Sequence, residues 1–539
     1  MKRFTALLIA AMLLLSLASV ASAELAAVGG ELPLWVGETQ KMTVGMVKND
    51  NVEDFETNVY TGLLEKAGNV DLDFVIFPNV ETNTKFAAML MANEEFPDVI
   101  AFDLGDYRNN FIEAGVLLPI DEYLETSSVY VKAYMDDPAN ADMLPYFKAY
   151  DGNIYAIPYL NKVIGNEWAS RAWINQDWLT KLDMPIPTTT DEYLETLRAF
   201  RANDLNGDGA TDDQYPLLTF VGGWNSEPYN FLMSSFIFAN AAVDYLLVDE
   251  NGVLDIAINK PEWKAGLQYM NQLVNENLLD KISFTQDQNA MRSIIKQDNK
   301  PLGSTIVSST SLWQEHPNRE DMVAMGPLVG PEGVQYTTPF IQLPSGRWYI
   351  TRYADNPELA FRLGDYTWNP TVSVASRLGE PETDWHWTSE EEKATLKALY
   401  WDMGFEAMLV RINDRWGVLQ NGHWTDNTSA YRPYEYADPG FVWSGDIHDY
   451  LYTTALAVKL NYQKVPDNFV LPLVLTGDEA VEAADLKVAI NALRDEWRTG
   501  LVLGTQSFDD WDAYVNELDI AGLPRWLEIQ QSAYDRMFK

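Results

Sequence analysis

The sequence contains no cysteine among its 539 residues. The chain therefore forms no disulfide, offers no thiolate to a metal and has no cysteine nucleophile. It also has no cysteine to which a lipid anchor could be attached after an export signal. A fold without such cross-links must be stabilised by burial of apolar side chains, which a chain of this length supplies once it is divided into two or three domains.

Histidine is almost as rare, with four in the chain. None stands in an HExxH or CxxH spacing, so a catalytic zinc site is not expected. The sequence also lacks the GxSxG motif of serine hydrolases and the GxxxxGK(S/T) loop that binds nucleotide phosphates. One hydrolytic arrangement stays open, a carboxylate pair for glycoside hydrolysis, for which Asp384 beside Trp385 is the nearest candidate.

Basic residues are scarce relative to acidic ones. The chain has 38 Lys and Arg against 79 Asp and Glu, which gives a formal net charge of −41. Long-range repulsion at such a charge opposes encounters with nucleic acids, anionic membrane surfaces and polyanionic ligands. Neutral or cationic ligands are favoured. The alternative interpretation is that the charge only keeps an exported surface soluble.

Long apolar runs are missing apart from one near the N-terminus. Lys2 and Arg3 precede an apolar stretch over residues 6–15, and Ala21-Ser22-Ala23 forms a small-residue cleavage site. This is the anatomy of a secretory signal peptide covering residues 1–23. The run contains serines and has no basic flank after it, so it is a poor membrane span. We expect an exported protein; the alternative is a retained N-terminal anchor.

Aromatic residues, by contrast, are plentiful: 18 Trp, 27 Tyr and 22 Phe make up 12% of the chain. Tryptophan and tyrosine combine a flat apolar face with a polar group, which suits them to stack on sugar rings or on peptide side chains. Most of them are still expected in the core, because tryptophan is usually deeply buried.

The first part of the chain alternates strands with helices. Strands are predicted over 42–47, 71–77 and 96–102, and helices over 55–67 and 83–93. This order is typical of an α/β fold with a parallel sheet and helices on both faces. Ligands of such sheets bind at the carboxyl ends of the strands. The polar residues placed there are Lys48, Asn49, Asp50 and Asp103.

Beyond residue 150, two segments indicate crossings into a different part of the molecule, at 151–178 and at 337–350. The first is rich in Gly, Pro, Asn and aromatic residues. Helical patterns then predominate, over 191–202, 263–277, 287–297, 357–368, 390–405, 480–498 and 508–537, with a short strand at 303–309. We therefore expect more than one domain.

The stretch 204–213, DLNGDGATDD, is typical of a calcium-binding loop. Counted from its first residue, oxygen-bearing side chains occupy positions 1, 3, 5 and 9, and glycine allows the sharp turn at position 6. The glutamate that a calcium sensor carries at position 12 is replaced by Tyr215, and Pro216 prevents an outgoing helix from starting there. We predict a static calcium clip; the alternative is a metal-free acidic turn. The predicted ligands are Asp204, Asn206, Asp208, the carbonyl of Ala210, Asp212 and Asp213.

Several segments, in this order along the chain, resemble one protein family. They are FPDVIAFDLGDYRNNFIEAGVLLPIDEYLE (96–125), DGNIYAIPY (151–159), the stretch 171–217 with its Asp-Trp-Leu, capped helix and calcium-like loop, NPELAFRLGDYTW (356–368), RLGEPETDWHW (377–387) and FDDWDAYVNELDIAGLPRWLEIQQSAYDRM (508–537). Together they resemble the large extracellular solute-binding proteins of bacterial ABC importers, in the oligosaccharide-type branch of family 1. Anchored members carry a lipid-modified cysteine, which this sequence lacks.

The resemblance implies a two-lobed α/β fold of the periplasmic-binding-protein type II, with a hinge that the chain crosses more than once and that closes on ligand. Residues 24–160 plus about 345–440 would form the N-terminal lobe, and 161–344 plus about 441–539 the C-terminal lobe. The implied protein is a monomeric binding component, not an enzyme, with structural calcium. It would capture a neutral or partly cationic oligosaccharide in the periplasm or outside the cell and deliver it to ABC permease subunits. The alternatives are a secreted carbohydrate-active hydrolase and a peptide-binding protein of the same fold.

The expected ligand residues are carboxylates at strand ends and aromatic or basic residues along the crossovers and the second lobe. They are Asp50, Asp103, Tyr159, Trp168, Arg171, Trp224, Trp313, Trp385 and Trp443. The carboxylates can accept hydrogen bonds from sugar hydroxyls, and the rings can stack on sugars. The alternative for each is a packed core or hinge residue, and Arg171 can instead pair with an acid and fix the hinge.

Overall fold

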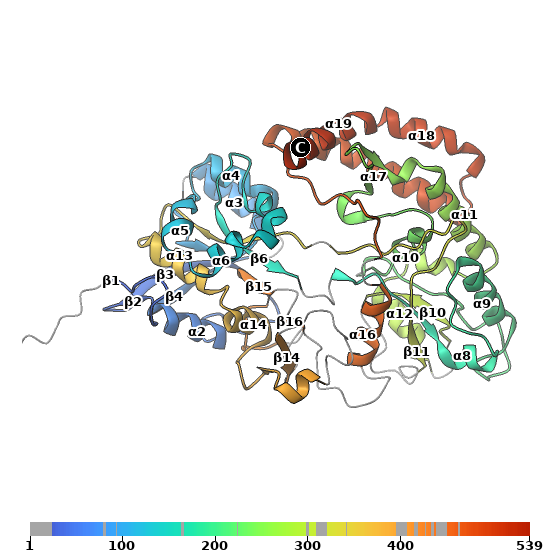
Figure 1. Cartoon of the computed structure of the whole chain (residues 1–539), viewed down its shortest axis with the longest axis horizontal. Coiled ribbons are helices and arrows are strands. Elements are labelled where there is room, and N and C mark those ends of the chain that lie inside the picture. Colours follow the sequence, from blue (N-terminus) through green and yellow to red (C-terminus); the bar gives the residue numbers. More distant parts are fainter. Residues whose placement is uncertain are drawn as a thin grey trace, which may run out of the picture. The chain divides into compact units, whose positions relative to one another are not determined.

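A computed structural model describes residues 24–78, 82–92, 94–162, 167–223, 225–297, 301–308, 321–340, 342–394, 407–413, 419–425, 427–432, 436–437, 450–461 and 464–539. The chain divides into two compact units, which we describe separately (Figure 1). Unit 1 comprises Met1–Asn161, Leu343–His386 and Ile412–Arg432, and unit 2 comprises Lys162–Gln342, Trp387–Arg411 and Pro433–Lys539. The predicted signal peptide lies outside the described residues. Across those ranges, no helix has the length and apolar character needed to cross a membrane.

Unit 1 is built on a six-stranded mixed sheet in the order β15-β6-β12-β5-β3-β4. The strands are β3 (Gln40–Val47), β4 (Val70–Phe77), β5 (Val99–Ile100), β6 (Ala156–Asn161), β12 (Ser345–Ile350) and β15 (Ala430–Arg432). β3 pairs in parallel with β4 on one side and with β5 on the other. β12 runs antiparallel to β5 and β6, whereas β15 is parallel to β6. The first two predicted strands and their parallel pairing are confirmed.

The third predicted strand, 96–102, is reduced to the two residues of β5. A carboxylate oxygen of Asp98 accepts hydrogen bonds from the backbone N–H of Thr43 (2.7 Å) and from its hydroxyl (2.6 Å). The backbone N–H of Asp98 donates in return to Thr43 Oγ1 at 2.9 Å. Side-chain hydrogen bonds thus hold the chain beside β3 at this position, and backbone pairing begins only at Val99.

Helices cover both faces of the sheet of unit 1; Figure 1 shows α3 (Thr82–Ala92) and α4 (Arg108–Glu113) on one side and α2 (Val59–Gly68) on the other. α2 begins four residues later than predicted, because Asn58 caps it by accepting a hydrogen bond from Tyr60 N at 3.0 Å. Among the described residues, the other α-helices of this unit are α5 (Asp121–Thr126), α6 (Tyr130–Asp136), α13 (Pro357–Tyr366) and α14 (Pro370–Leu378).

Unit 2 contains a three-stranded sheet in the order β10-β7-β11, with both outer strands antiparallel to β7. The strands are β7 (Ala172–Asn175), β10 (Ser304–Ile306) and β11 (Met322–Met325). Around them lie α8 (Gln176–Lys181), α9 (Thr190–Ala202), α10 (Pro228–Leu232), α11 (Pro261–Asn275), α12 (Gln288–Ile295) and α16 (Tyr450–Asn461). Helices thus predominate in this unit, as the sequence pattern predicted for 191–202, 263–277 and 287–297.

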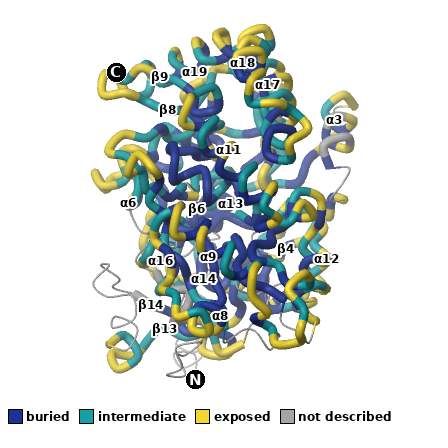
Figure 2. The backbone as a smooth tube through the Cα atoms, turned by 90° about the vertical axis from the view of Figure 1, so that its right-hand side faces the viewer, coloured by how far each residue is buried: buried dark blue, intermediate teal, exposed yellow. Residues whose placement is uncertain are grey.

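Of the C-terminal helices, α17 (Gly477–Leu503) packs on α11, and α18 (Trp511–Ile520) and α19 (Leu523–Phe538) pack on α17 and on each other (Figure 2). The pattern over 508–537 predicts one helical segment, but the structure divides it at Gly522, whose φ of 98° lies in the left-handed region. Pro524 then stands in the first turn of α19, where its missing N–H has no helical partner to lose.

Candidate functional site

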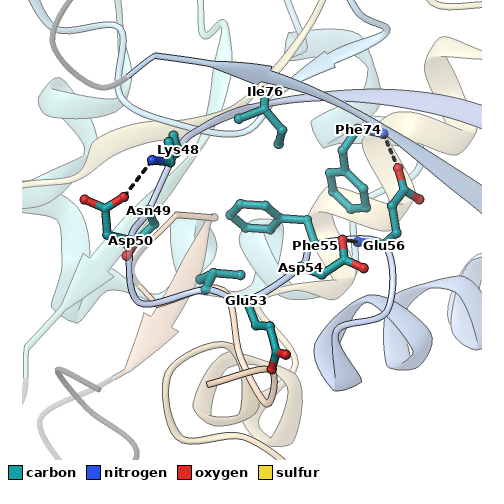
Figure 3. Close-up of a pocket in the computed structure, with 10 residues that line it drawn as sticks. Lys48, Asn49, Asp50, Glu53, Asp54, Phe55, Glu56, Phe74 and Ile76 are labelled. Carbon is teal, nitrogen blue, oxygen red and sulfur yellow. Dashed lines mark hydrogen bonds and ion pairs between the residues drawn. The ribbon is translucent and has the colours of Figure 1, made fainter. Parts of the chain in front are cut away.

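The loop that follows β3 carries polar side chains at the carboxyl end of the sheet of unit 1, as predicted (Figure 3). Lys48 Nζ pairs with Asp50 Oδ1 at 2.9 Å, and both side chains are largely exposed. Asn49 donates through its amide to Thr425 Oγ1 at 2.8 Å and accepts from Asn51 N at 2.9 Å, which fixes the turn of the loop. The carboxylate of Asp50 is thus presented to solvent from an anchored backbone.

This loop and the end of β4 enclose a pocket of about 320 Å³ in unit 1 (Figure 3). Its apolar wall consists of Val52, Phe55, Phe74 and Ile76, and its polar residues are Lys48, Asn49, Asp50, Glu53, Asp54 and Glu56. The rings of Phe55 and Phe74 lie 5.7 Å apart, and both contact Trp424, which is fully buried. Buried ring contacts of this kind hold the wall rigid.

Two carboxylates of the pocket are fixed by the backbone. Glu56 Oε1 accepts a hydrogen bond from Phe74 N at 3.1 Å, and Asp54 Oδ1 accepts one from Glu56 N at 3.1 Å (Figure 3). An apolar wall beside oriented hydrogen-bond acceptors suits a ligand that has an apolar face and several hydroxyl donors. With four carboxylates and one ammonium group around the space, a neutral or cationic ligand is favoured over an anion.

Asp103 lies in the turn after β5, where its Oδ1 accepts a hydrogen bond from Gly105 N at 2.8 Å. The residue is exposed, and Gly105 adopts a φ of 52°, which turns the chain sharply into the next helix. The carboxylate therefore stands at the predicted end of the sheet, and its ligand role stays a prediction.

Tyr159, on β6, lies between two arginines of unit 1. The guanidinium carbons of Arg347 and Arg432 lie 5.7 Å and 5.5 Å from its ring centroid, and Arg432 also donates to its phenol oxygen. Cation–π contacts with arginine orient an aromatic ring and engage its face. The ligand role of Tyr159 stays a prediction, and nothing in the sequence pattern indicated its two arginine neighbours.

Trp168 and Arg171 lie in unit 2 and are both buried, with 5% and 4% exposure. Arg171 donates through Nε to the carbonyl of Trp168 at 3.1 Å and through a terminal nitrogen to the carbonyl of Ser308 at 2.8 Å. These bonds tie the segment before β7 to the segment after β10. They favour a positioning role for Arg171, with the ligand role of either residue still a prediction.

The remaining predicted aromatic residues divide into two groups. Trp224, Trp313 and Trp443 lie outside the described residues. Trp385 is fully buried in unit 1, and its Nε1 donates to the carbonyl of Gly379 at 3.1 Å. A ring without an exposed face cannot stack on a sugar, so this structure favours the core alternative for Trp385, and its ligand role stays a prediction. Its neighbour Asp384 is also buried and accepts a hydrogen bond from Glu380 N at 3.0 Å, which indicates a structural role.

The loop 204–213 follows α9, whose first turn is closed by reciprocal hydrogen bonds between Thr189 and Glu192. Asp204 accepts from Gly207 N at 2.7 Å and from Gly209 N at 2.9 Å, so its two oxygens shape the turn. The side-chain amide of Asn206 donates to Asp208 and to Asp213, at 3.2 Å in each case. The amide thus joins carboxylates from two of the predicted ligand positions.

Whether these residues suit calcium can be judged from their donors. Within the described ranges, no group of three or more His, Asp or Glu side chains is arranged to hold a metal ion. The donor chemistry nevertheless fits, since hard oxygen ligands are what calcium requires. The N–H groups of the Asn206 amide contact Asp208 and Asp213, at the place where a bound cation would neutralise these carboxylates. A rotation of this amide would turn its carbonyl oxygen, a suitable calcium ligand, toward the same place.

Gln214 closes this loop, although it was not among the residues predicted for the loop. The residue is buried, with 2% exposure. Its side-chain oxygen accepts from Leu205 N at 2.8 Å and from Asn206 N at 3.2 Å, and its amide donates to the carbonyl of Asn203 at 2.9 Å. The sequence signal that could have indicated Gln214 is its uncharged side chain directly after Asp212 and Asp213.

Comparison with known proteins gives a consistent result. The family described as "Bacterial extracellular solute-binding protein" matches residues 49–367. The chain is 26% identical over 488 residues to the fructooligosaccharide ABC transporter substrate-binding protein FusA of Streptococcus pneumoniae, covering 88% of this chain and 86% of that one.

Solved structures show the same architecture. A FusA EF-hand mutant in complex with fructo-nystose is 21% identical, with a TM-score of 0.68 over 92% of this chain and 99% of the other. An HMO-binding ABC-transporter-associated solute-binding protein from Bifidobacterium longum infantis is 18% identical, with a TM-score of 0.75 over the same shares. The α/β fold class predicted from the order of strands and helices is confirmed.

Proposed function

Because the chain belongs to the bacterial extracellular solute-binding protein family, we propose that it is the substrate-binding component of an ABC importer and that its ligand is an oligosaccharide. Membership confirms the resemblance seen in the sequence. It also makes the protein a binding protein rather than a hydrolase, in accord with the buried, structural Asp384.

The observation that carries the ligand class is the pocket after β3. A rigid wall of phenylalanine and isoleucine beside fixed carboxylates complements a sugar ring, which has apolar C–H faces and a rim of hydroxyl donors. The similarity to FusA, which is named as a fructooligosaccharide-binding component, supports an oligosaccharide as the class of ligand. We assign Asp50 to this pocket and Asp103 to the adjacent strand end as acceptors of sugar hydroxyls.

The experiment is titration calorimetry with a panel of three sugars: kestose, maltotriose and trigalacturonate. We expect binding of a neutral sugar and weaker binding of trigalacturonate, because the acidic residues around the pocket repel a uronate. Reducing-end assays after long incubation should show no turnover. Binding of a cationic or neutral peptide with no response to any sugar would reject the oligosaccharide assignment, and so would turnover.

We also propose that the loop 204–213 binds a structural calcium ion. The side chains of Asp204, Asn206, Asp208, Asp212 and Asp213 and the carbonyl of Ala210 would hold it. The ion would neutralise carboxylates that now share one amide. The relative named as an EF-hand mutant supports a loop of this kind in the family.

The remaining proposals concern processing and assembly. Removal of residues 1–23 would leave an exported chain that begins at Glu24, and the missing cysteine excludes anchoring through a lipidated thiol. We propose that the mature protein is a monomer that delivers its ligand to permease subunits. We also propose that its lobes follow the boundaries predicted from the resemblance, except that Trp387–Arg411 belongs with unit 2. Intact mass of the secreted protein tests the cleavage position.

A further inference from the structure

A second, smaller pocket lies in unit 1, away from the residues that line the first. It is lined by Arg108, Tyr146, Phe147, Ala149, Tyr155, Ala156, Pro158, Pro344 and Gly346. These residues come from the start of α4, from the segment before β6, from β6 itself and from the start of β12. Its free space holds about one water-sized group. Neither Asp50 nor any other residue of the first pocket takes part.

Tyr146 is the unusual member of this lining. The side chain is 7% exposed, and its phenol oxygen is buried without a hydrogen-bond partner among the described residues. A hydroxyl buried in this way is costly unless a partner is supplied. Burial raises the pKa of the phenol, so the group remains a neutral hydroxyl that can both donate and accept.

Arg108 is the second unusual member. It is half-buried, and no ion pair or hydrogen bond joins its guanidinium group to any residue in the described ranges. Acidic residues outnumber basic ones about two to one in this chain, so an arginine without a carboxylate partner is unexpected. Its N–H groups are all donors, so an oxygen atom placed in the pocket can accept from them.

The other side chains give the pocket its shape. Tyr155 is held by a hydrogen bond from its phenol to Asp151 Oδ2 at 2.8 Å. Gly346 leaves space for Tyr349, because a Cβ at this position would collide with the Tyr349 phenol oxygen. The walls are therefore fixed. Among the described residues, the buried phenol of Tyr146 has no hydrogen-bond partner, and the half-buried guanidinium of Arg108 has no ion pair.

From this geometry, and resting on the proposed function, we infer that the pocket is a subsite that accepts a single alcohol group of the bound oligosaccharide, a hydroxyl or hydroxymethyl substituent. An alcohol oxygen accepts from Arg108 and exchanges a hydrogen bond with Tyr146, and it matches the space of one water molecule. A carboxylate would also accept from both groups. The alcohol is favoured because the free space suits one water-sized group, whereas a carboxylate brings two oxygens and a carbon.

The test compares two tyrosine variants by calorimetry with the neutral sugar of the panel that binds best. Tyr146→Phe removes the phenol oxygen and should weaken binding about tenfold, as expected for loss of one buried hydrogen bond. Tyr134→Phe is the matched control. Its phenol is also buried and unpartnered within the described part of unit 1, but it does not line the pocket, so affinity should be unchanged.

Stability without ligand separates binding from folding. Because the Tyr146 phenol has no partner in the described structure, Tyr146→Phe should leave the melting temperature unchanged or raise it. Arg108→Gln should weaken sugar binding at least tenfold, whereas Arg352→Gln, which removes the same charge from an exposed site of unit 1, should not.

The outcomes are distinguishable. Unchanged affinity of Tyr146→Phe, or a drop in its melting temperature, overturns the subsite while wild-type sugar binding still supports the proposed function. Tighter wild-type binding of trigalacturonate than of the neutral sugars, lost in Arg108→Gln, replaces the alcohol by a carboxylate. Absence of sugar binding by the wild type overturns both inferences.

Discussion

Arg198 of α9 and Glu276, just after α11, form a two-pronged ion pair, with Nε–Oε2 and Nη2–Oε1 distances of 2.6 Å each. The hydrogen bonds from Arg198 lower the pKa of Glu276 from 4.5 to about 2. Two parallel N–H···O bonds fix the geometry of both side chains. The pair thereby links α9, the helix that precedes the loop 204–213, to the end of α11, which packs on α17.

This pair predicts an acid-dependent loss of stability. Because the pKa of Glu276 is lower in the folded state, its contribution is complete above about pH 4.5 and is lost as the pH falls toward 2. Glu276→Gln should therefore lower the urea midpoint at pH 7 and flatten the decline between pH 4.5 and 2. Glu195→Gln is the control, since Glu195 meets the same arginine from a more exposed position and should matter less.

Calcium removal is expected to lower the melting temperature of the full chain. A chelator would leave the carboxylates of the loop 204–213 without their counter-ion. Asp204→Ala combined with Asp208→Ala should abolish the difference between chelator and calcium, measured by differential scanning fluorimetry. Asp249→Asn, in a turn of unit 2 outside the loop, should keep it. Superimposable melts of the wild type in both conditions would reject the metal.

The wall of the first pocket gives a prediction for affinity. Ile76 lines the pocket and is 41% exposed, so Ile76→Ala should cost little stability yet weaken sugar binding about three- to tenfold through lost apolar contact. Val75→Ala is the matched control, because the adjacent residue of β4 points to the other face and is 37% exposed. Equal effects of both variants on the dissociation constant would contradict the assignment of this face.

Of the substitutions considered, we expect the one at Asp365 to cause the largest loss of stability. Its buried carboxylate accepts hydrogen bonds from Ser128 Oγ and from the backbone N–H groups of Val129, Tyr130 and Val131, which begin α6. Asp365→Asn leaves some of these donors without an acceptor and should cost about 3 kcal/mol in the free energy of unfolding. Glu358→Gln removes a charged acceptor of one hydrogen bond, from Ser127, and should cost much less. Denaturant titration compares the two.

The sequence predicted the first two strands well because they alternate or are continuously apolar within the expected length. The predicted length of β5 was too great. At Asp98 a side chain replaces backbone pairing with β3, and the alternation of apolar and polar residues does not reveal such a replacement. The prediction also ran two helices together at Gly522, although a glycine followed by Leu-Pro was a usable signal.

For the site, strand ends were more informative than aromatic residues. Asp50 was placed by topology and lies at a pocket, whereas Trp385 was chosen for its ring and is core. A tryptophan side chain can pack in the core or stack on a ligand, so the residue type alone does not tell a core residue from a ligand-binding one. Tyr146 could not be found at all, because an unsatisfied hydroxyl is a property of three-dimensional packing.

The position of β4 at the end of its sheet bears on the behaviour of the protein in concentrated solution. An end strand offers unpaired backbone groups to a second copy. Here Asp71 and Asp73 project from it and meet Lys41 of β3 at 3.3 and 3.4 Å. Addition of a strand from another copy would bring like charges together and disturb the ion pairs of Lys41 with Asp71 and Asp73. Glu65 and Glu56 in addition accept hydrogen bonds from the backbone N–H groups of Leu72 and Phe74 on the same strand, so acidic side chains oppose the addition of a further strand here.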